Sequence, residues 1–290
     1  MSKRIIVLLI ACAMALSLSG CGKTPAVKET ERLIAAIGNV TADSVDAVEA
    51  AEEAYQALSE QEKADVKNHG DLEAARTELD ALLLDALRTD IVGTWVLDMD
   101  VTEILAEKIS PQFANQGISF GDYLEPCALK ITLELLEDGV FRLTVDDAAM
   151  EQTQERLLEA ARTCTEEYML LGIAATLQET GVEGDFTTRE GIEAAIGMPL
   201  DELLQSSLGM GLDDYAARTV EDLLADPAGR SMEGSYEVQP EQLILSNASN
   251  PDDPEGNMTA TFTLAGDELT LQVEPYIFDL TSLVFHRAVA

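Results

Sequence analysis

Hydrophobic residues follow two different periods along the chain. Between residues 26 and 88 they recur three or four positions apart, which is typical of amphipathic helices. From residue 90 to residue 290 many of them alternate with polar residues, which is typical of half-buried antiparallel strands. The sequence therefore predicts an α+β protein in which a small helical bundle at 26–88 precedes a β domain at 90–290.

The alternating stretches predict an antiparallel barrel. We expect about eight strands joined as hairpins, because such strands can close into an up-and-down barrel that leaves no exposed edge. After the first strand, residues 104–114 have the spacing of a helix. A longer helical insertion at 148–228 separates the third strand from the fourth.

The insertion contains a short internal repeat. The strings GMPLDEL at 197–203 and GMGLDDY at 209–215 each place acidic residues at the expected start of a helix, where they complement the helix dipole. The apolar stripes of these helices can be buried only against each other or against the barrel mouth. We therefore expect the insertion to form a helical cap.

The beginning of the chain has the pattern of an export signal. Two basic residues at 3–4 precede an apolar run at 5–18, which is too short to span a bilayer comfortably. The run ends in Leu-Ser-Gly-Cys at 18–21. Taken alone, these residues are also compatible with an ordinary secretory signal or an uncleaved membrane anchor.

The string at 18–21 resembles the lipobox of bacterial lipoproteins. In that family the cysteine thiol receives a diacylglycerol and the chain is cleaved before it. The resemblance implies a signal peptide at 1–20, a tether at 21–25 and lipid attachment, with palmitate-type chains, at Cys21. It places the protein on the outer face of the cell membrane, with the membrane as a partner through Cys21.

The helical segment has a resemblance of its own. Residues 51–66 follow the pattern AxxAYxALSxxEKAxV, which is similar to a helical module of surface and secreted proteins from Gram-positive anaerobes. This resemblance implies a spacer or interaction module. His69 follows the pattern at the end of a short helix, where a histidine is typically a surface or capping residue.

Gly93-Thr94-Trp95, at the start of the first strand, resembles the G-x-W signature of lipocalins and lipocalin-like bacterial lipoproteins. In that family the tryptophan closes one end of the barrel and a basic residue late in the last strand covers it. The resemblance implies a stack of Arg287 on Trp95 and a small apolar ligand inside the barrel. Candidate lining residues are Leu129, Ile131, Leu133, Phe141 and Tyr236. The alternative for the same residues is core packing, because a barrel of this size can be filled by its own side chains.

Charge and composition restrict the chemistry. The chain has 290 residues and a net charge of −36, with 18 Lys and Arg against 54 Asp and Glu, which excludes most nucleic-acid binding. With two histidines and no recognised catalytic, nucleotide or EF-hand motif, we expect no catalytic residue, metal or cofactor. Cys127 and Cys164 allow either one disulfide or two buried thiols.

Two functions agree with these patterns. The first is a membrane-anchored, extracytoplasmic lipoprotein of the binding or structural type, whose partner is a small apolar ligand or a surface molecule. The second is a secreted hydrolase that acts on an envelope or extracellular polymer. A ligand-sized pocket would favour a binding protein, and converging buried carboxylates would favour an enzyme.

Overall fold

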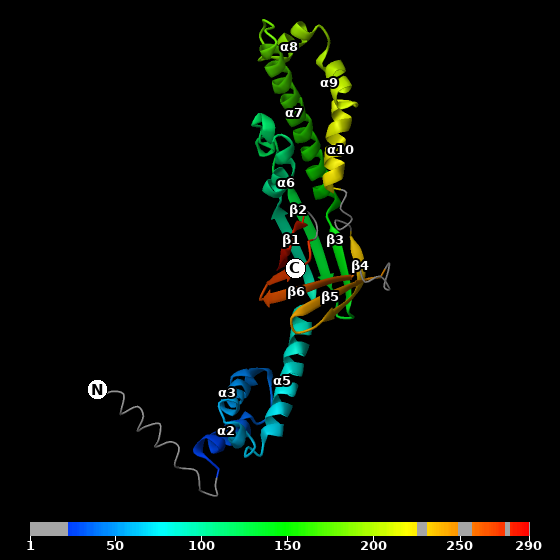
Figure 1. Ribbon diagram of the computed structural model, residues 1–290. Coiled ribbons are helices and arrows are strands. Elements are labelled where there is room, and N and C mark those ends of the chain that lie inside the picture. Colours follow the sequence, from blue (N-terminus) through cyan, green and yellow to red (C-terminus); the bar gives the residue numbers. More distant parts are fainter. Residues whose placement is uncertain (1–22, 225–230, 249–256, 276–278, 290) are drawn as a thin grey trace, which may run out of the picture. The chain divides into compact units, whose positions relative to one another are not determined.

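The computed structural model describes residues 23–224, 231–248, 257–275 and 279–289 (Figure 1). These residues belong to two compact units, and the division falls after Arg88. The expected signal peptide and its lipidation site, Cys21, lie outside the described residues.

The first unit is helical and has one apolar core. Its helices are α2 (Pro25–Ile37), η1 (Ala42–Ser44), α3 (Val45–Gln56), α4 (Glu60–Lys63) and α5 (His69–Asp90). Thr24 caps α2, and Gly38, with φ of 65°, ends it. Val27, Val48 and Leu79 are fully buried in the shared core. The predicted segment is helical, and α2 begins inside the segment expected to be a tether.

The start of α5 differs from the sequence prediction. The order Asn68-His69-Gly70 is typical of a helix end, yet α5 begins at His69. The imidazole of His69 stacks on the Tyr55 ring with 4.0 Å between centroids. This contact, together with the burial of Leu72, holds the first turn of α5 against α3.

In the second unit, eight strands form a closed antiparallel barrel in the order β1 to β8, which confirms the predicted eight-stranded barrel. The strands are β1 (Gly93–Asp100), β2 (Ala128–Leu135), β3 (Val140–Val145), β4 (Met232–Val238), β5 (Gln242–Asn247), β6 (Asn257–Ala265), β7 (Glu268–Gln272) and β8 (Ser282–Arg287). The barrel closes where β1 pairs with β8, with Trp95 opposite Arg287.

The two ends of the barrel carry different connections. Short turns at 136–139, 239–241 and 266–267 join strands at the end where β1 begins. At the opposite end, β1 is followed by α6 (Thr102–Ile109), and β3 is followed by the long insertion. We name the first the closed end and the second the open end.

The segment between β1 and β2 is less helical than its pattern predicts. The helix expected at 104–114 ends at Ile109, and short turns η2 (Ser110–Gln112), η3 (Ala114–Gln116) and η4 (Phe120–Asp122) follow. Pro111 explains this difference, because its ring and missing N–H are incompatible with the interior of an α-helix.

The insertion between β3 and β4 is a helical hairpin. Its helices are α7 (Asp147–Glu179), α8 (Arg189–Ile196), α9 (Leu200–Leu208) and α10 (Leu212–Leu224). Figure 1 shows α7 leaving the open end and α9 and α10 returning beside it. The two copies of the repeat lie at the starts of α9 and α10, as predicted. The first glycine of each copy, Gly197 or Gly209, ends the preceding helix with a φ of 75°. In place of the expected cap, the helices pair mainly with each other.

Candidate functional site

At the closed end, one arginine joins the last strand to the chain that enters the first. The Arg287 guanidinium lies over the Trp95 ring, with Cζ 4.1 Å from the centroid. Its Nη1 donates to the Val92 carbonyl at 2.9 Å and its Nη2 to the Asp90 carbonyl at 2.6 Å. Trp95 Nε1 donates to the Ile91 carbonyl at 2.8 Å. A cation among carbonyls at the end of a helix is favoured by the helix dipole. This end is therefore sealed by backbone and side-chain contacts.

The candidate lining residues on β2 and β3 face the barrel interior. Leu129, Ile131, Leu133 and Phe141 are at most 1% exposed. A ligand-sized cavity beside these side chains would leave part of their surface accessible to water. Their surface is instead covered by neighbouring protein atoms, as expected of a packed core. This packing supports the alternative in which the barrel fills itself.

Tyr236 is half-buried and has a polar partner of its own. Its hydroxyl donates to the Leu136 carbonyl at 2.7 Å, at the β2–β3 hairpin of the closed end. Burial raises the pKa of this phenol, and the nearby Asp138 carboxylate raises it further. Tyr236 therefore stabilises the turn at the closed end with its hydroxyl.

Cys127 and Cys164 are both buried and free. Cys127 lies beside Thr153 on α7, and Cys164 is about three turns further along that helix, about 16 Å away at 1.5 Å per residue. A disulfide needs Cα atoms within about 7 Å of each other. Burial raises the pKa of Cys127, and it raises the pKa of Cys164 to about 11. Both thiols are protonated, buried apolar groups.

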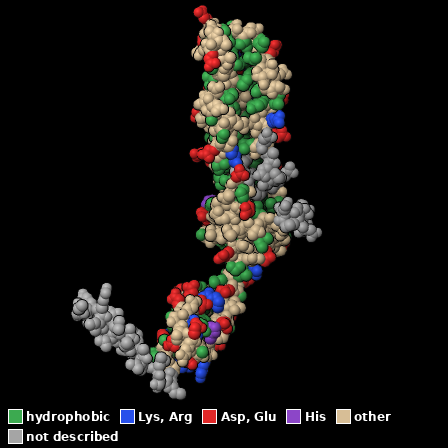
Figure 2. All heavy atoms as spheres, viewed as in Figure 1, with side chains coloured by type: hydrophobic (Ala, Val, Ile, Leu, Met, Phe, Trp, Pro, Cys, Tyr) green, Lys and Arg blue, Asp and Glu red, His purple; other side chains and the backbone are tan. Residues whose placement is uncertain are grey.

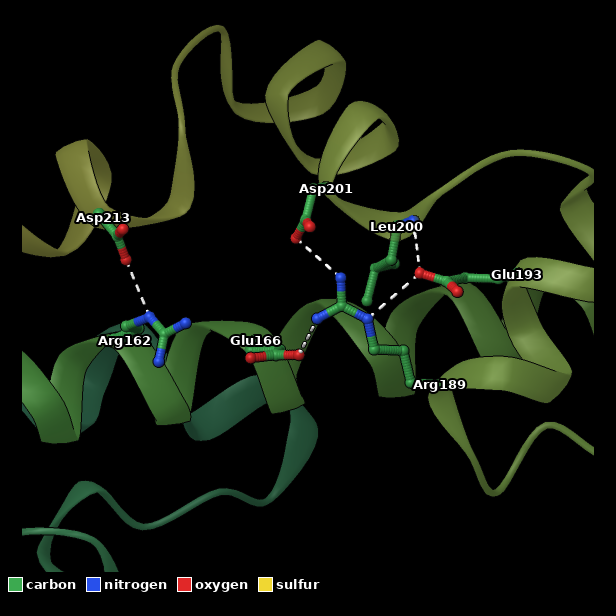
Figure 3. A network of polar contacts seen from close by, with 7 residues as sticks. All are labelled: Arg162, Glu166, Arg189, Glu193, Leu200, Asp201 and Asp213. Carbon is green, nitrogen blue, oxygen red and sulfur yellow. Dashed lines mark hydrogen bonds and ion pairs between the residues drawn. The ribbon is translucent and has the colours of Figure 1, made fainter.

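An arginine also organises the far end of the hairpin (Figure 3). Arg189 donates to Glu166 on α7 at 2.8 Å, to Glu193 on α8 at 3.2 Å and to Asp201 on α9 at 2.8 Å. Glu193 also accepts the Leu200 N–H at 2.9 Å, which caps the start of α9. That backbone hydrogen bond and the contact with Arg189 lower the pKa of Glu193. One guanidinium thus holds three helices together.

A second ion pair, which lies nearer the barrel, joins α7 to α10. Arg162 Nε on α7 donates to Asp213 Oδ1 on α10 at 2.8 Å. Ala216 and Val220 of α10 are buried close by. The first turns of α7 contact the barrel directly, because Thr153 donates to the Ala128 carbonyl at the start of β2.

A pocket of about 600 Å³ lies between the distal half of α7 and α8. Its size is within the range of ligand pockets, about 300–1,000 Å³. Its walls combine apolar and polar side chains: Thr163, Glu166, Glu167, Leu170, Leu171, Ala174, Gln178, Phe186, Thr187, Thr188 and Ile192. None of these residues is among the candidates predicted from the sequence. The long apolar run in α7 is the one sequence feature that could have indicated the pocket, and such a run is equally typical of a helix buried in a protein core.

A larger hollow, about 750 Å³, lies on the outside of β3, β4 and β5. Its lining includes the outward side chains of Arg142 and Glu233, whose closest charged atoms are 3.5 Å apart. Beyond Leu143 and Met232 the two strands no longer pair, which opens the hollow. It faces away from the barrel core.

In ranges 23–224, 231–248, 257–275 and 279–289, no three His, Cys, Asp or Glu side chains come together as metal ligands could. Within these same ranges, each helix is too short or too polar to cross a bilayer.

No protein-family model matches the chain, and searches of curated proteins and of solved structures return no match.

Proposed function

We propose that this protein is a membrane-anchored, extracytoplasmic lipoprotein of the binding or structural type. In this proposal the barrel is a rigid scaffold, and the helical hairpin at its open end carries the binding surface. The observation that carries the proposal is a contrast in packing. Leu129, Ile131, Leu133 and Phe141, which face the barrel interior on β2 and β3, are at most 1% exposed, whereas the hairpin holds an open pocket of about 600 Å³.

The anchor is supported by the lipobox-like string that ends at Cys21. Because the chain carries a charge of −36, an anionic membrane surface repels its folded part. A covalent lipid would overcome this repulsion at one point and leave the remainder of the protein in solvent. Lipocalin-like architecture is supported by Trp95 and Arg287, which occupy the positions that the G-x-W resemblance implies.

The small apolar ligand inside the barrel stays a prediction from the sequence. Binding there would require Leu129, Ile131 and Leu133 to separate from the protein atoms that now cover them. The scaffold version of the function needs no such rearrangement, and we therefore prefer it.

The anchor is tested by metabolic labelling with an alkyne analogue of palmitate, followed by mass spectrometry of the mature N-terminus. We expect label on the wild-type protein and on Cys12→Ser, the matched control in the apolar run, and no label on Cys21→Ser. Release of unmodified wild-type protein into the medium would contradict the proposal.

A further inference from the structure

The distal half of α7 is rich in apolar residues, but much of its surface is not buried. Residues 168–177 read YMLLGIAATL and cover every side of the helix with apolar groups. A helix of this kind is normally buried on all sides. Among these ten residues only Ala174 is buried, and Leu171 is 41% exposed. The helices of the described hairpin therefore cover only part of this surface.

The loops of the hairpin expose two further apolar side chains. Val182, after α7, is 40% exposed, and Met198, between α8 and α9, is 42% exposed. The pocket between α7 and α8 adds a concave part, with Leu170, Phe186 and Ile192 in its walls. Figure 2 shows hydrophobic side chains on the visible face of the hairpin, with acidic side chains along its edges. Apolar patches with a polar rim are typical of protein-binding sites.

The rim of this surface is negative. Glu166 and Glu167 line the pocket, and Glu179, Glu183 and Asp185 follow in the chain. The insertion contains few basic residues, and two of them, Arg162 and Arg189, form ion pairs with acidic residues of the hairpin (Figure 3). A second copy of this chain, with its charge of −36, would be repelled from such a rim. The charge favours a partner that carries Lys or Arg beside its apolar residues.

We propose that this face of α7, together with the pocket, is a docking site for an amphipathic, positively charged segment of a partner protein. An apolar side chain of the partner enters the pocket beside Leu171, and its basic residues lie along the acidic rim. Helix-in-groove recognition uses this combination of anchors and flanking charges. The inference deepens the proposed function, because it rests on the binding role of the hairpin, and it is independent of the lipid anchor.

The test measures binding of a fluorescent synthetic peptide made of Leu and Lys in amphipathic order. The full-length chain is used with Cys21→Ser, so that no attached lipid can enter the pocket and the result does not depend on lipidation. We expect saturable binding that weakens at least tenfold in Leu171→Ser, because one anchoring contact is lost. The matched control is Leu83→Ser, since Leu83 on α5 is similarly exposed at 38%. Its affinity for the peptide should equal that of the parent chain.

Four results would overturn the proposal. The first is equal binding to the parent chain and Leu171→Ser, and the second is equal binding of a Leu and Glu peptide. The third is a concentration-dependent dimer that Leu171→Ser dissociates, which would assign the surface to a second copy. The fourth is flotation of the Cys21→Ser chain with phosphatidylcholine vesicles that Leu171→Ser abolishes, which would assign it to a bilayer.

Discussion

The guanidinium of Arg287 occupies the space in which a side chain at position 93 would begin. A Cβ atom on Gly93 would lie 2.6 Å from Nη1 of Arg287, and the φ angle of Gly93 is 145°, a value that other residues rarely adopt. The first residue of the G-x-W string is therefore a glycine for two reasons, the backbone angle and the close approach of the arginine. The glycine, the tryptophan and the arginine form one unit at the closed end.

Replacement of Gly93 by alanine should destabilise the protein. We expect Gly93→Ala to lower the free energy of unfolding by about 1–3 kcal/mol, because the methyl group strains the backbone and displaces the guanidinium. The measurement is chemical denaturation, with Gly121→Ala as a control. A Cβ at Gly121 would meet its nearest neighbour at 3.5 Å, an ordinary contact. Equal losses for the two variants would contradict this explanation.

Replacement of Arg287 by alanine should also destabilise the barrel. It removes two charged hydrogen bonds and the stack on Trp95, for an expected loss of about 2–4 kcal/mol in the free energy of unfolding. Arg142 is the control, because its ion pairs at 3.8 and 3.5 Å lie on the exposed outer face. Arg142→Ala should change stability by about 0.5 kcal/mol or less. If the two arginines prove equivalent in urea denaturation, the role assigned to Arg287 is wrong.

The barrel could be predicted because its signal is local. Alternation places Tyr236 opposite Leu245 and Val238 opposite Leu243 across a short turn, and the structure has this register. The ends of helices were less predictable where a single residue or a contact between distant residues determines them. Pro111 shortens α6, and the stack of His69 on Tyr55 belongs to a helix start that the local pattern does not show.

The hairpin network should respond to the loss of its central arginine. In Arg189→Gln, α8 loses its ionic contacts with Glu166 on α7 and with Asp201 on α9, while the barrel keeps its own core. We expect backbone amides of α8 and α9 to exchange with solvent about tenfold faster, with unchanged protection in β1 and β2. Hydrogen–deuterium exchange read by mass spectrometry measures both regions at once. Arg218→Gln, on the exposed side of α10, is the matched control and should leave α8 and α9 unchanged.

Acid should loosen the same part of the hairpin through Glu193. Its folded-state pKa is lower than the ordinary 4.5, so its stabilising contribution is complete above pH 4.5 and is lost as the pH falls through the lowered value. Glu193→Gln should remove this part of the pH dependence of α8–α9 amide exchange. Glu190→Gln, on the same helix, should retain it. An unchanged acid profile in Glu193→Gln would contradict the role of this carboxylate.

The hairpin site could not be derived from sequence, because its contacts join distant positions without a shared period. Glu166, Asp201 and Arg189 lie on three helices, and no local pattern pairs them. The cysteines show the same limit, since composition alone could not place Cys127 beside Thr153, about three turns of α7 away from Cys164. By contrast, the Trp95–Arg287 stack could be anticipated from a resemblance that ties both residues to fixed places in a barrel.

The central claim is that the barrel is a packed scaffold and that binding belongs to the hairpin. Methyl NMR spectra of the full-length protein, titrated with the neutral apolar probe N-phenyl-1-naphthylamine, test it most directly. The account predicts that the methyl resonances of Leu129, Ile131 and Leu133 do not move. Saturable shifts of these three residues would contradict it and would show that the barrel opens to hold an apolar ligand.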